Sequence, residues 1–119
     1  MSRRGAPKLP RLSESQVLEM LREGRYRVCR RTGEVTGPGG KVITPFAVGS
    51  RRFVRVYGFG GVRVITLARL VWMSVTLEVI PPGYEVHHRD EVCQNDGWDN
   101  LIALHKLDHR KVHYDSAPF

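Results

Sequence analysis

All five histidines of the chain lie between positions 87 and 113, in two groups separated by a polar loop. His87 and His88 end the extended segment YEVHH, and His105, His109 and His113 recur every four residues in HKLDHRKVH. Residues four apart share one face of a helix, so His109 and His113 can bind one metal ion, with His105 above them. The pattern predicts a strand, a loop and a helix that converge on one cation. A histidine-rich solvent face or a purely structural zinc site is the alternative.

Charge is divided unevenly along the chain, whose formal net charge is +7. Residues 1–85 hold 15 Lys and Arg against 6 Asp and Glu, whereas residues 86–119 hold 4 against 6. A basic balance favours an acidic partner, either nucleic acid or an anionic membrane. A basic region followed by a histidine-rich one fits a DNA grip joined to a cation site. An ordinary solvated basic surface is the other interpretation.

Length and composition exclude several classes of protein. A chain of 119 residues that is 41% hydrophobic fits one globular domain with a modest core. Cys29 and Cys93 form no CxxC pair, which excludes a four-cysteine zinc ribbon and leaves one disulfide open. Neither a signal peptide nor a membrane span is expected from the apolar runs, so we expect a cytoplasmic protein.

The chain divides into three expected regions. Residues 1–12 predict a flexible basic arm, residues 13–82 a DNA-binding helix and β-sheet region, and residues 83–119 the unit that carries the chemistry. Ser13 is a good N-cap, and Gln16 three residues later completes a capping box, so a helix is expected from there to Gly24. A second, mostly apolar helix is expected from Leu67 to about residue 75, packed under the sheet.

Alternating apolar and charged residues predict strands in the middle of the chain, near 26–30, 34–36, 41–44, 52–57 and 62–65. The last two would pair across the turn at 58–61. Several of these strands place arginine on one face and Val, Tyr or Phe on the other. The candidates for a basic, DNA-binding sheet face are Arg27, Arg52, Arg55 and Arg63.

The segment HHRDEVCQNDGWDNL resembles the core of the HNH endonuclease family, in the branch common among phage and intron-borne homing enzymes. That branch reads His-His-x-Asp, then an Asn pair, then Asn-Leu. The spacing is matched here by His87-His88-Arg89-Asp90, Asn95-Asp96 and Asn100-Leu101. The later pair, His109 and His113, resembles the end of the family's ββα-metal motif. The specific match covers about residues 83–113.

Three positions depart from the family's pattern. Asp96 stands where the second Asn is expected, Glu91 replaces the usual Gly, and His87 stands where some relatives have Asp. The first two lie in the loop, where we expect them to leave the chemistry intact. The third makes the site richer in imidazole, which favours Zn²⁺, Ni²⁺ or Mn²⁺ over an oxygen-only site.

The resemblance implies an α+β fold, with a small antiparallel sheet and a packed helix followed by a C-terminal ββα-metal finger. It makes His88 the general base, and Asn100 the residue that ties the loop aiming His88. His105 is open to two interpretations, a further contact to the site or an exposed residue, and we favour the exposed one. The remaining expected roles are metal binding for His87, His109 and His113, support of the site by Asp90 and Asn95, and phosphate contact by Arg89 and Arg110, for which a plain surface role is equally open.

The function that the resemblance implies is endonucleolytic hydrolysis of double-stranded DNA, leaving 3′-OH and 5′-phosphate ends. One divalent ion, Mg²⁺, Mn²⁺, Ni²⁺ or Zn²⁺, would be required. A phage or mobile element acting in a host cell is the expected source, and nicking or homing the expected mode. The alternatives are a non-catalytic DNA-binding protein with a structural metal site, an RNA-binding or ribosome-associated basic protein, and a secreted toxin nuclease.

Overall fold

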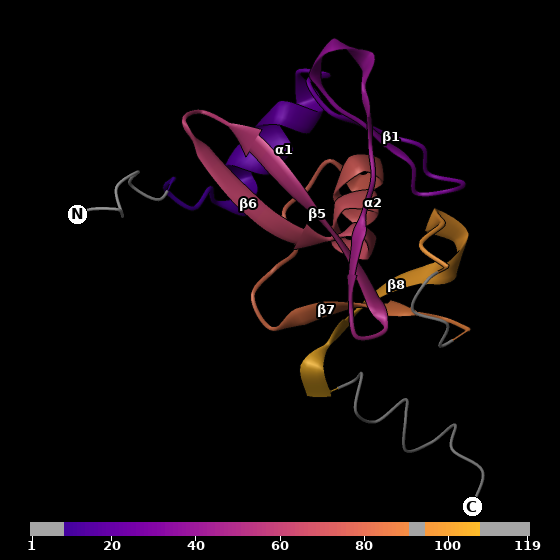
Figure 1. Cartoon of the computed structure of the whole chain (residues 1–119). Coiled ribbons are helices and arrows are strands. Elements are labelled where there is room, and N and C mark those ends of the chain that lie inside the picture. The colour runs from indigo at the N-terminus through magenta and orange to yellow at the C-terminus, as the bar shows by residue number, and fades with distance from the viewer. Residues whose placement is uncertain (1–8, 91–94, 108–119) are drawn as a thin grey trace, which may run out of the picture.

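Two helices, two three-stranded antiparallel sheets and a two-stranded hairpin make up residues 9–90 and 95–107, the part of the chain that this computed structural model describes (Figure 1). The α+β class expected from the sequence is confirmed. In chain order the elements are α1 Glu14–Arg22, β1 Arg27–Val28, β2 Val35–Thr36, the 3-10 turn η1 Pro38–Gly40, β3 Val42–Ile43, β4 Phe46–Val48, β5 Arg51–Gly58, β6 Gly61–Thr66, α2 Leu67–Thr76, β7 Tyr84–His88, the 3-10 turn η2 Trp98–Asn100 and β8 Leu101–His105.

Helix α1 begins at the capping box that the sequence predicts. The Gln16 amide donates to Ser13 Oγ over 3.1 Å, and the Ser13 amide donates to Gln16 Oε1 over 2.9 Å. Both bonds satisfy amides that a helix start leaves without a partner. The helix ends at Arg22, and Gly24 follows with a φ of 77°, a left-handed conformation that glycine adopts without strain.

Two separate sheets replace the one upstream sheet expected from the sequence. Strands β1, β2 and β3 form the first, and β4, β5 and β6 form the second. The hairpin of β5 and β6 is confirmed, with a two-residue turn at Phe59 and Gly60 in which both φ values are positive. Tyr26 joins the two sheets, since its hydroxyl donates to Tyr57 O and accepts from Tyr57 N.

Helix α2 lies at the centre of the core, between α1 and the hairpin of β7 and β8 (Figure 1). Thr66 caps its start by accepting from the Arg69 amide, and Leu77 ends it in the left-handed conformation. The helix is apolar on most sides because it contacts both sheets, α1 and the hairpin. Neither described helix is long and apolar enough to cross a membrane. The fully buried core side chains of α2 are Leu67, Leu70, Val71 and Met73.

The prediction that four arginines share one sheet face is wrong. Arg27 belongs to the first sheet, and the others to the second. Successive residues of a strand face opposite sides, so Arg52 and Arg55 of β5 lie on opposite faces. Arg63 faces the core with Arg52, because it pairs with the buried Val56. Of the three candidates in this sheet, only Arg55 lies on the outward face.

Arg63 is tied into the interior by specific partners. Its guanidinium donates to Leu12 O over 3.1 Å and lies 3.4 Å from the Glu14 carboxylate. Burial lowers the pKa of Arg63, nearby Arg11 and Arg69 lower it further, and Glu14 opposes them. The Arg69 guanidinium also grips Glu14, through both carboxylate oxygens at 2.8 and 2.9 Å. Arg63 therefore has a structural role in the core, where it links β6 to the start of α1.

The last residues of the arm expected over 1–12 are fixed to the sheet. Val62 donates its amide to Pro10 O over 2.9 Å, and Leu12 donates its amide to Val62 O over 3.0 Å. Leu12 is buried in the core. Residues 1–8 of the arm lie outside the described residues. Residues 10–12, at the C-terminal end of the segment expected to be flexible, therefore lie along the edge of the sheet beside β6.

Candidate active site on the C-terminal hairpin

The hairpin of β7 and β8 presents the two adjacent histidines on opposite faces. Alternation along β7 puts Val86 and His88 on the face that packs towards the core, where both are buried. His88 pairs with Leu101 of β8, which is buried with it. His87 lies on the other face, half-buried and paired with Ile102. Two neighbouring imidazoles thus reach two different environments.

Asp96 holds the buried ring of His88. Its Oδ1 lies 2.8 Å from His88 Nε2, and the side chains are 2% and 9% exposed, respectively. The other carboxylate oxygen, Oδ2, accepts a hydrogen bond from Arg52 Nε over 3.0 Å and lies 3.0 Å from Arg52 Nη2 in an ion pair. Burial of a charged carboxylate is costly unless it is paired, and here both oxygens are. The result is a chain of three side chains that runs from β5 to the end of β7.

Asn100 ties the loop between the strands, as expected from the sequence. Its amide nitrogen donates to Asp90 Oδ1 and to Asn95 O, both over 2.8 Å, and its amide oxygen accepts from Asp90 N over 3.1 Å. Asn95 donates to the second oxygen of Asp90 over 2.9 Å. The Arg89 amide donates to Asn100 O over 2.7 Å. This network closes the ends of the loop immediately beyond His88.

The far side of the loop rests on an upstream turn. The Trp98 amide donates to Arg30 O over 2.6 Å. A Cβ on Gly97 would lie 2.6 Å from Arg31 O, so a larger residue there would force the backbone apart. Asp96 directly precedes this contact. Its position therefore depends on the turn between β1 and β2 as well as on its own loop.

The expected metal ligands are described only in part. His87 is in place on β7, whereas His109 and His113 lie outside the described residues, as does Arg110. Within residues 9–90 and 95–107, no three His, Cys, Asp or Glu side chains lie close enough together to hold a metal ion. An imidazole donor such as His87 fits Zn²⁺, Ni²⁺ or Mn²⁺ by its chemistry.

His105 occupies a different place from the one expected. It is the last residue of β8, paired with Tyr84, and so does not stand in one helix with the later histidines. Its ring is half-buried and lies edge-on to Tyr84 at 5.4 Å between centroids. Its Nδ1 accepts from Leu107 N over 3.3 Å. Both the shared helix and the exposure predicted for His105 are wrong, because cross-strand pairing extends β8 to this residue.

Comparison with known proteins gives one informative match. No protein-family model matches the sequence, and no curated protein matches it either. Among solved structures, the fold is similar to that of the HNH homing endonuclease I-HmuI, an enzyme that binds and cleaves DNA, with a TM-score of 0.65 at 22% sequence identity. The match covers 77% of this chain and 53% of the other, so this chain spans about half of that enzyme.

The chain has an HNH-type fold. This confirms the resemblance read from residues 83–113 at the level of architecture. At this identity the likeness concerns the fold alone. The roles of individual residues in the hairpin of β7 and β8 therefore rest on the contacts that they make in this structure.

Asp96 and Arg52 are the residues of the candidate site that sequence reasoning missed. Asp96 stands out in the sequence only as a departure from the family's Asn pair. Arg52 stands out only as one arginine of an alternating strand. The two are 44 positions apart, and no local pattern links them. A strand arginine on the apolar side of its alternation was the one available signal, because such a charge needs a buried partner.

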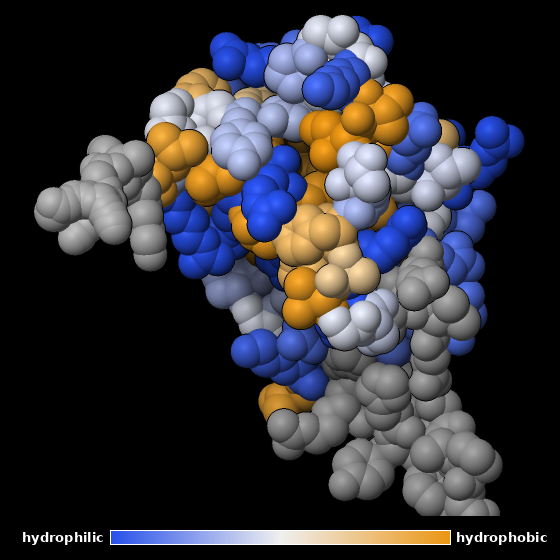
Figure 2. Space-filling model, viewed as in Figure 1, coloured by the Kyte–Doolittle hydropathy of each residue, from blue (hydrophilic) through white to orange (hydrophobic). Residues whose placement is uncertain are grey.

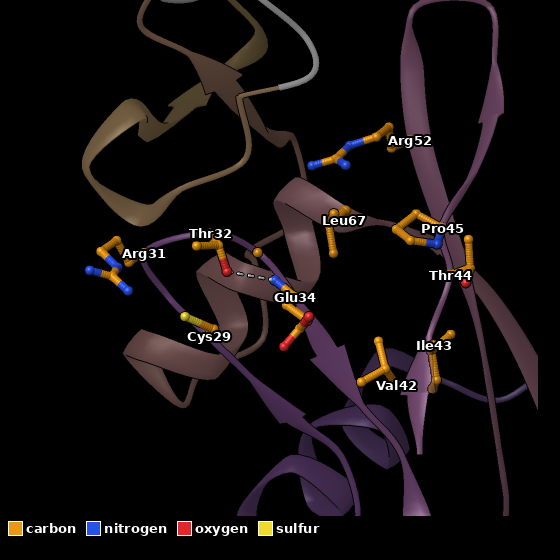
Figure 3. A pocket seen from close by; sticks show the side chains of 11 residues that line it. Cys29, Arg31, Thr32, Glu34, Val42, Ile43, Thr44, Pro45, Arg52 and Leu67 are labelled. Carbon is orange, nitrogen blue, oxygen red and sulfur yellow. Dashed lines mark hydrogen bonds between the residues drawn. The ribbon is translucent and has the colours of Figure 1, made fainter. Parts of the chain in front are cut away.

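A pocket of about 490 Å³ opens beside this site, between the turn after β1 and the segment from β3 to β4 (Figure 3). Arg52 stands at its edge, with its guanidinium extended away from its own strand. Cys29 lines the opposite side, and a hydrogen bond from the Thr32 side chain lowers the pKa of its thiol, helped by the backbone of Thr32 and Arg31. Leu67 of the buried core also lines the pocket.

Proposed function

We propose that this chain is a metal-dependent endonuclease that hydrolyses phosphodiester bonds of double-stranded DNA. The observation that carries the proposal is His88, an imidazole held by a buried carboxylate at the end of β7 in an HNH-type hairpin. Imidazole suits proton transfer near neutral pH. The loop that follows is closed by Asn100, so the ring is presented by a rigid frame.

His88 is proposed to take a proton from the attacking water. The water oxygen forms a bond to phosphorus while the bond from phosphorus to the 3′ oxygen breaks. The 3′ oxygen leaves and takes a proton from solvent, which gives 3′-OH and 5′-phosphate ends. His87, together with His109 and His113, would hold a divalent ion. The chemistry that such an ion supplies is neutralisation of charge on the phosphate.

DNA would be held by the basic residues that remain available. Arg52 and Arg63 are committed to internal carboxylates, whereas Arg27, Arg55 and Arg89 are exposed. Figure 2 shows apolar and hydrophilic side chains side by side over the face that carries β4 to β6. On this face the Arg55 guanidinium lies 4.4 Å above the Phe46 ring. Phosphate contacts give affinity without sequence information, so we expect loose specificity and nicking.

A non-catalytic DNA-binding protein is the second candidate. The observation that favours it is the burial of His88, whose side chain is only 9% exposed. A histidine in a buried polar cluster can serve stability alone. Under this candidate the chain binds DNA and cuts none.

The biological setting proposed for the nuclease is the cytoplasm of a host cell that carries a phage or mobile element.

Cleavage of supercoiled plasmid tests the proposal. The protein is assayed with EDTA and then with Mg²⁺, Mn²⁺, Ni²⁺ or Zn²⁺ added singly, beside His88→Ala. We expect metal-dependent nicking, and a loss of about 10²- to 10⁴-fold in His88→Ala while DNA binding persists, since that is the range a general base contributes. No cutting with any metal, by folded protein that binds DNA, would establish the non-catalytic candidate. Linear product before open circle would contradict nicking.

A further inference from the structure

The two oxygens of the Asp96 carboxylate are divided between two partners of different kinds. Oδ2 accepts a hydrogen bond from Arg52 Nε and forms an ion pair with Arg52 Nη2, and Oδ1 faces His88 Nε2. The Arg52 guanidinium can only donate hydrogen bonds, so it needs an oxygen that accepts. Oδ2 fills that place, and Oδ1 is the atom that remains for His88. The side chain of Asp96 is 2% exposed, which keeps water from competing for either oxygen.

The proton between Asp96 and His88 follows from this division. An ionised carboxylate only accepts, so the contact at 2.8 Å requires the proton on His88 Nε2. In the neutral ring Nδ1 then carries the lone pair. Across residues 9–90 and 95–107, Asp96 is the one hydrogen-bond partner of this ring, which leaves Nδ1 available.

We infer that Asp96, fixed by Arg52, is a positioning residue that locks His88 as the Nε2-protonated tautomer and makes Nδ1 the basic nitrogen. The inference deepens the proposed nuclease and rests on it only for the catalytic consequence. In that reaction Nδ1 takes the proton from water, the bond from water oxygen to phosphorus forms, and the bond to the 3′ oxygen breaks. The carboxylate stabilises the imidazolium that results, and solvent protonates the 3′ oxygen.

The departure from the family's Asn pair gains a physical meaning here. With Asn at position 96, Arg52 would still require the amide oxygen, because Arg52 has no acceptor. The amide NH₂ would then face His88 Nε2, which would have to accept. The ring proton would move to Nδ1, and the lone pair needed for water would be lost. Because Arg52 fixes the orientation of the side chain at position 96, Asp and Asn at this position would select opposite tautomers of His88.

Nitrogen-15 NMR of the histidine rings tests the lock without any need for activity. At alkaline pH, where imidazole is neutral, the two tautomers give different ring-nitrogen shifts. The His88 signals are assigned by their loss in His88→Ala. We expect the Nε2-protonated form in the wild type, the Nδ1-protonated form in Asp96→Asn, and a return to the first form in the double variant Arg52→Met, Asp96→Asn, where the amide is free to turn.

Plasmid cleavage with the same variants measures the consequence. We expect Asp96→Asn to lose about 10²-fold or more, as tautomer reversal does in a comparable His–Asp pair. The double variant should recover at least about tenfold of that loss, a non-additivity that signals coupling. Asp99→Asn, the same change at an exposed position of η2, is the matched control and should alter neither readout.

Several outcomes would overturn the inference. An Nδ1-protonated His88 in the wild type does so, whether or not Asp96→Asn folds. So does an Asp96→Asn protein that keeps the wild-type tautomer and rate. If the wild type cuts no DNA, the proposed function fails, and the NMR result still decides whether Asp96 sets the tautomer.

Discussion

Two carboxylates inside this molecule each hold two basic side chains, and their partners set them apart. Glu14 at the start of α1 holds Arg69 and Arg63. Asp96 in the loop after β7 holds Arg52 and His88. Arginine stays charged and only donates, so the first cluster has a single arrangement. A neutral histidine has two tautomers, so the second cluster has two possible positions for the ring proton of His88.

The comparison shows how similar ion pairing can serve two purposes. The Glu14 cluster ties α1 to β6 and α2, and all of its elements belong to the upstream part of the core. The Asp96 cluster joins β5 to the candidate active site, across 44 positions of sequence. Substitution at Glu14 should therefore change the stability of the fold, whereas substitution at Asp96 should change the tautomer of His88.

Glu14→Gln should give the largest change in the free energy of unfolding. It removes the charge that both arginines share, and breaking a buried pair costs about 3–5 kcal/mol. The Glu14 side chain is 13% exposed and its partners more so, so we expect about 2 kcal/mol. Urea denaturation measures it, with the exposed Glu19→Gln as control. Plasmid cleavage below the melting range should be unchanged, and a selective loss of cleavage would erase the contrast between the clusters.

Asn100→Ala should have a smaller effect on stability, about 1–2 kcal/mol, because three side-chain hydrogen bonds are lost at a half-buried site. The Asp90 amide loses its acceptor and should exchange its hydrogen faster. Cleavage should fall with it, since the loop carries Asp96. Asn95→Ala, which removes one side-chain bond to Asp90, is the graded control. Equal effects of the two changes would contradict the central place given to Asn100.

The reactivity of Cys29 should show the smallest effect. Its lowered pKa means that the thiolate forms at a lower pH than in a free thiol, so alkylation by iodoacetamide should reach half its maximal rate at a lower pH. A Cys93→Ser background isolates the signal. Thr32→Val should shift the midpoint upward, and Thr32→Ser, which keeps the hydroxyl, should not. A midpoint equal to that of a free thiol would refute the assigned cause.

Local signals in the sequence predicted the elements whose causes are local. The capping box of α1, the apolar run of α2 and the turn between β5 and β6 all depend on residues close in sequence. Strand β4 was not predicted, because three residues are too few to show a period of two. The split into two sheets also had no local signal.

Non-local contacts decided the parts of the site that the sequence analysis missed. The four-residue spacing of histidines fits a helix, but pairing with Tyr84 makes His105 the end of a strand. The loop tie by Asn100 could be expected from the family's motif. The partnership of Asp96 and Arg52 could not, since it exists only once β5 and the loop are folded against α2.

The contact of Gly97 and Trp98 with the turn after β1 bears on whether the hairpin is a transferable module. A hairpin with its own loop network looks like a unit that could be grafted onto another scaffold. Here, however, the residue that orients the ring is aligned from outside, by backbone at Arg30 and Arg31 and by the side chain of Arg52. A graft of residues 83–119 alone would carry the histidines without their alignment. Evolutionary exchange of this site would have to move the upstream sheets with it.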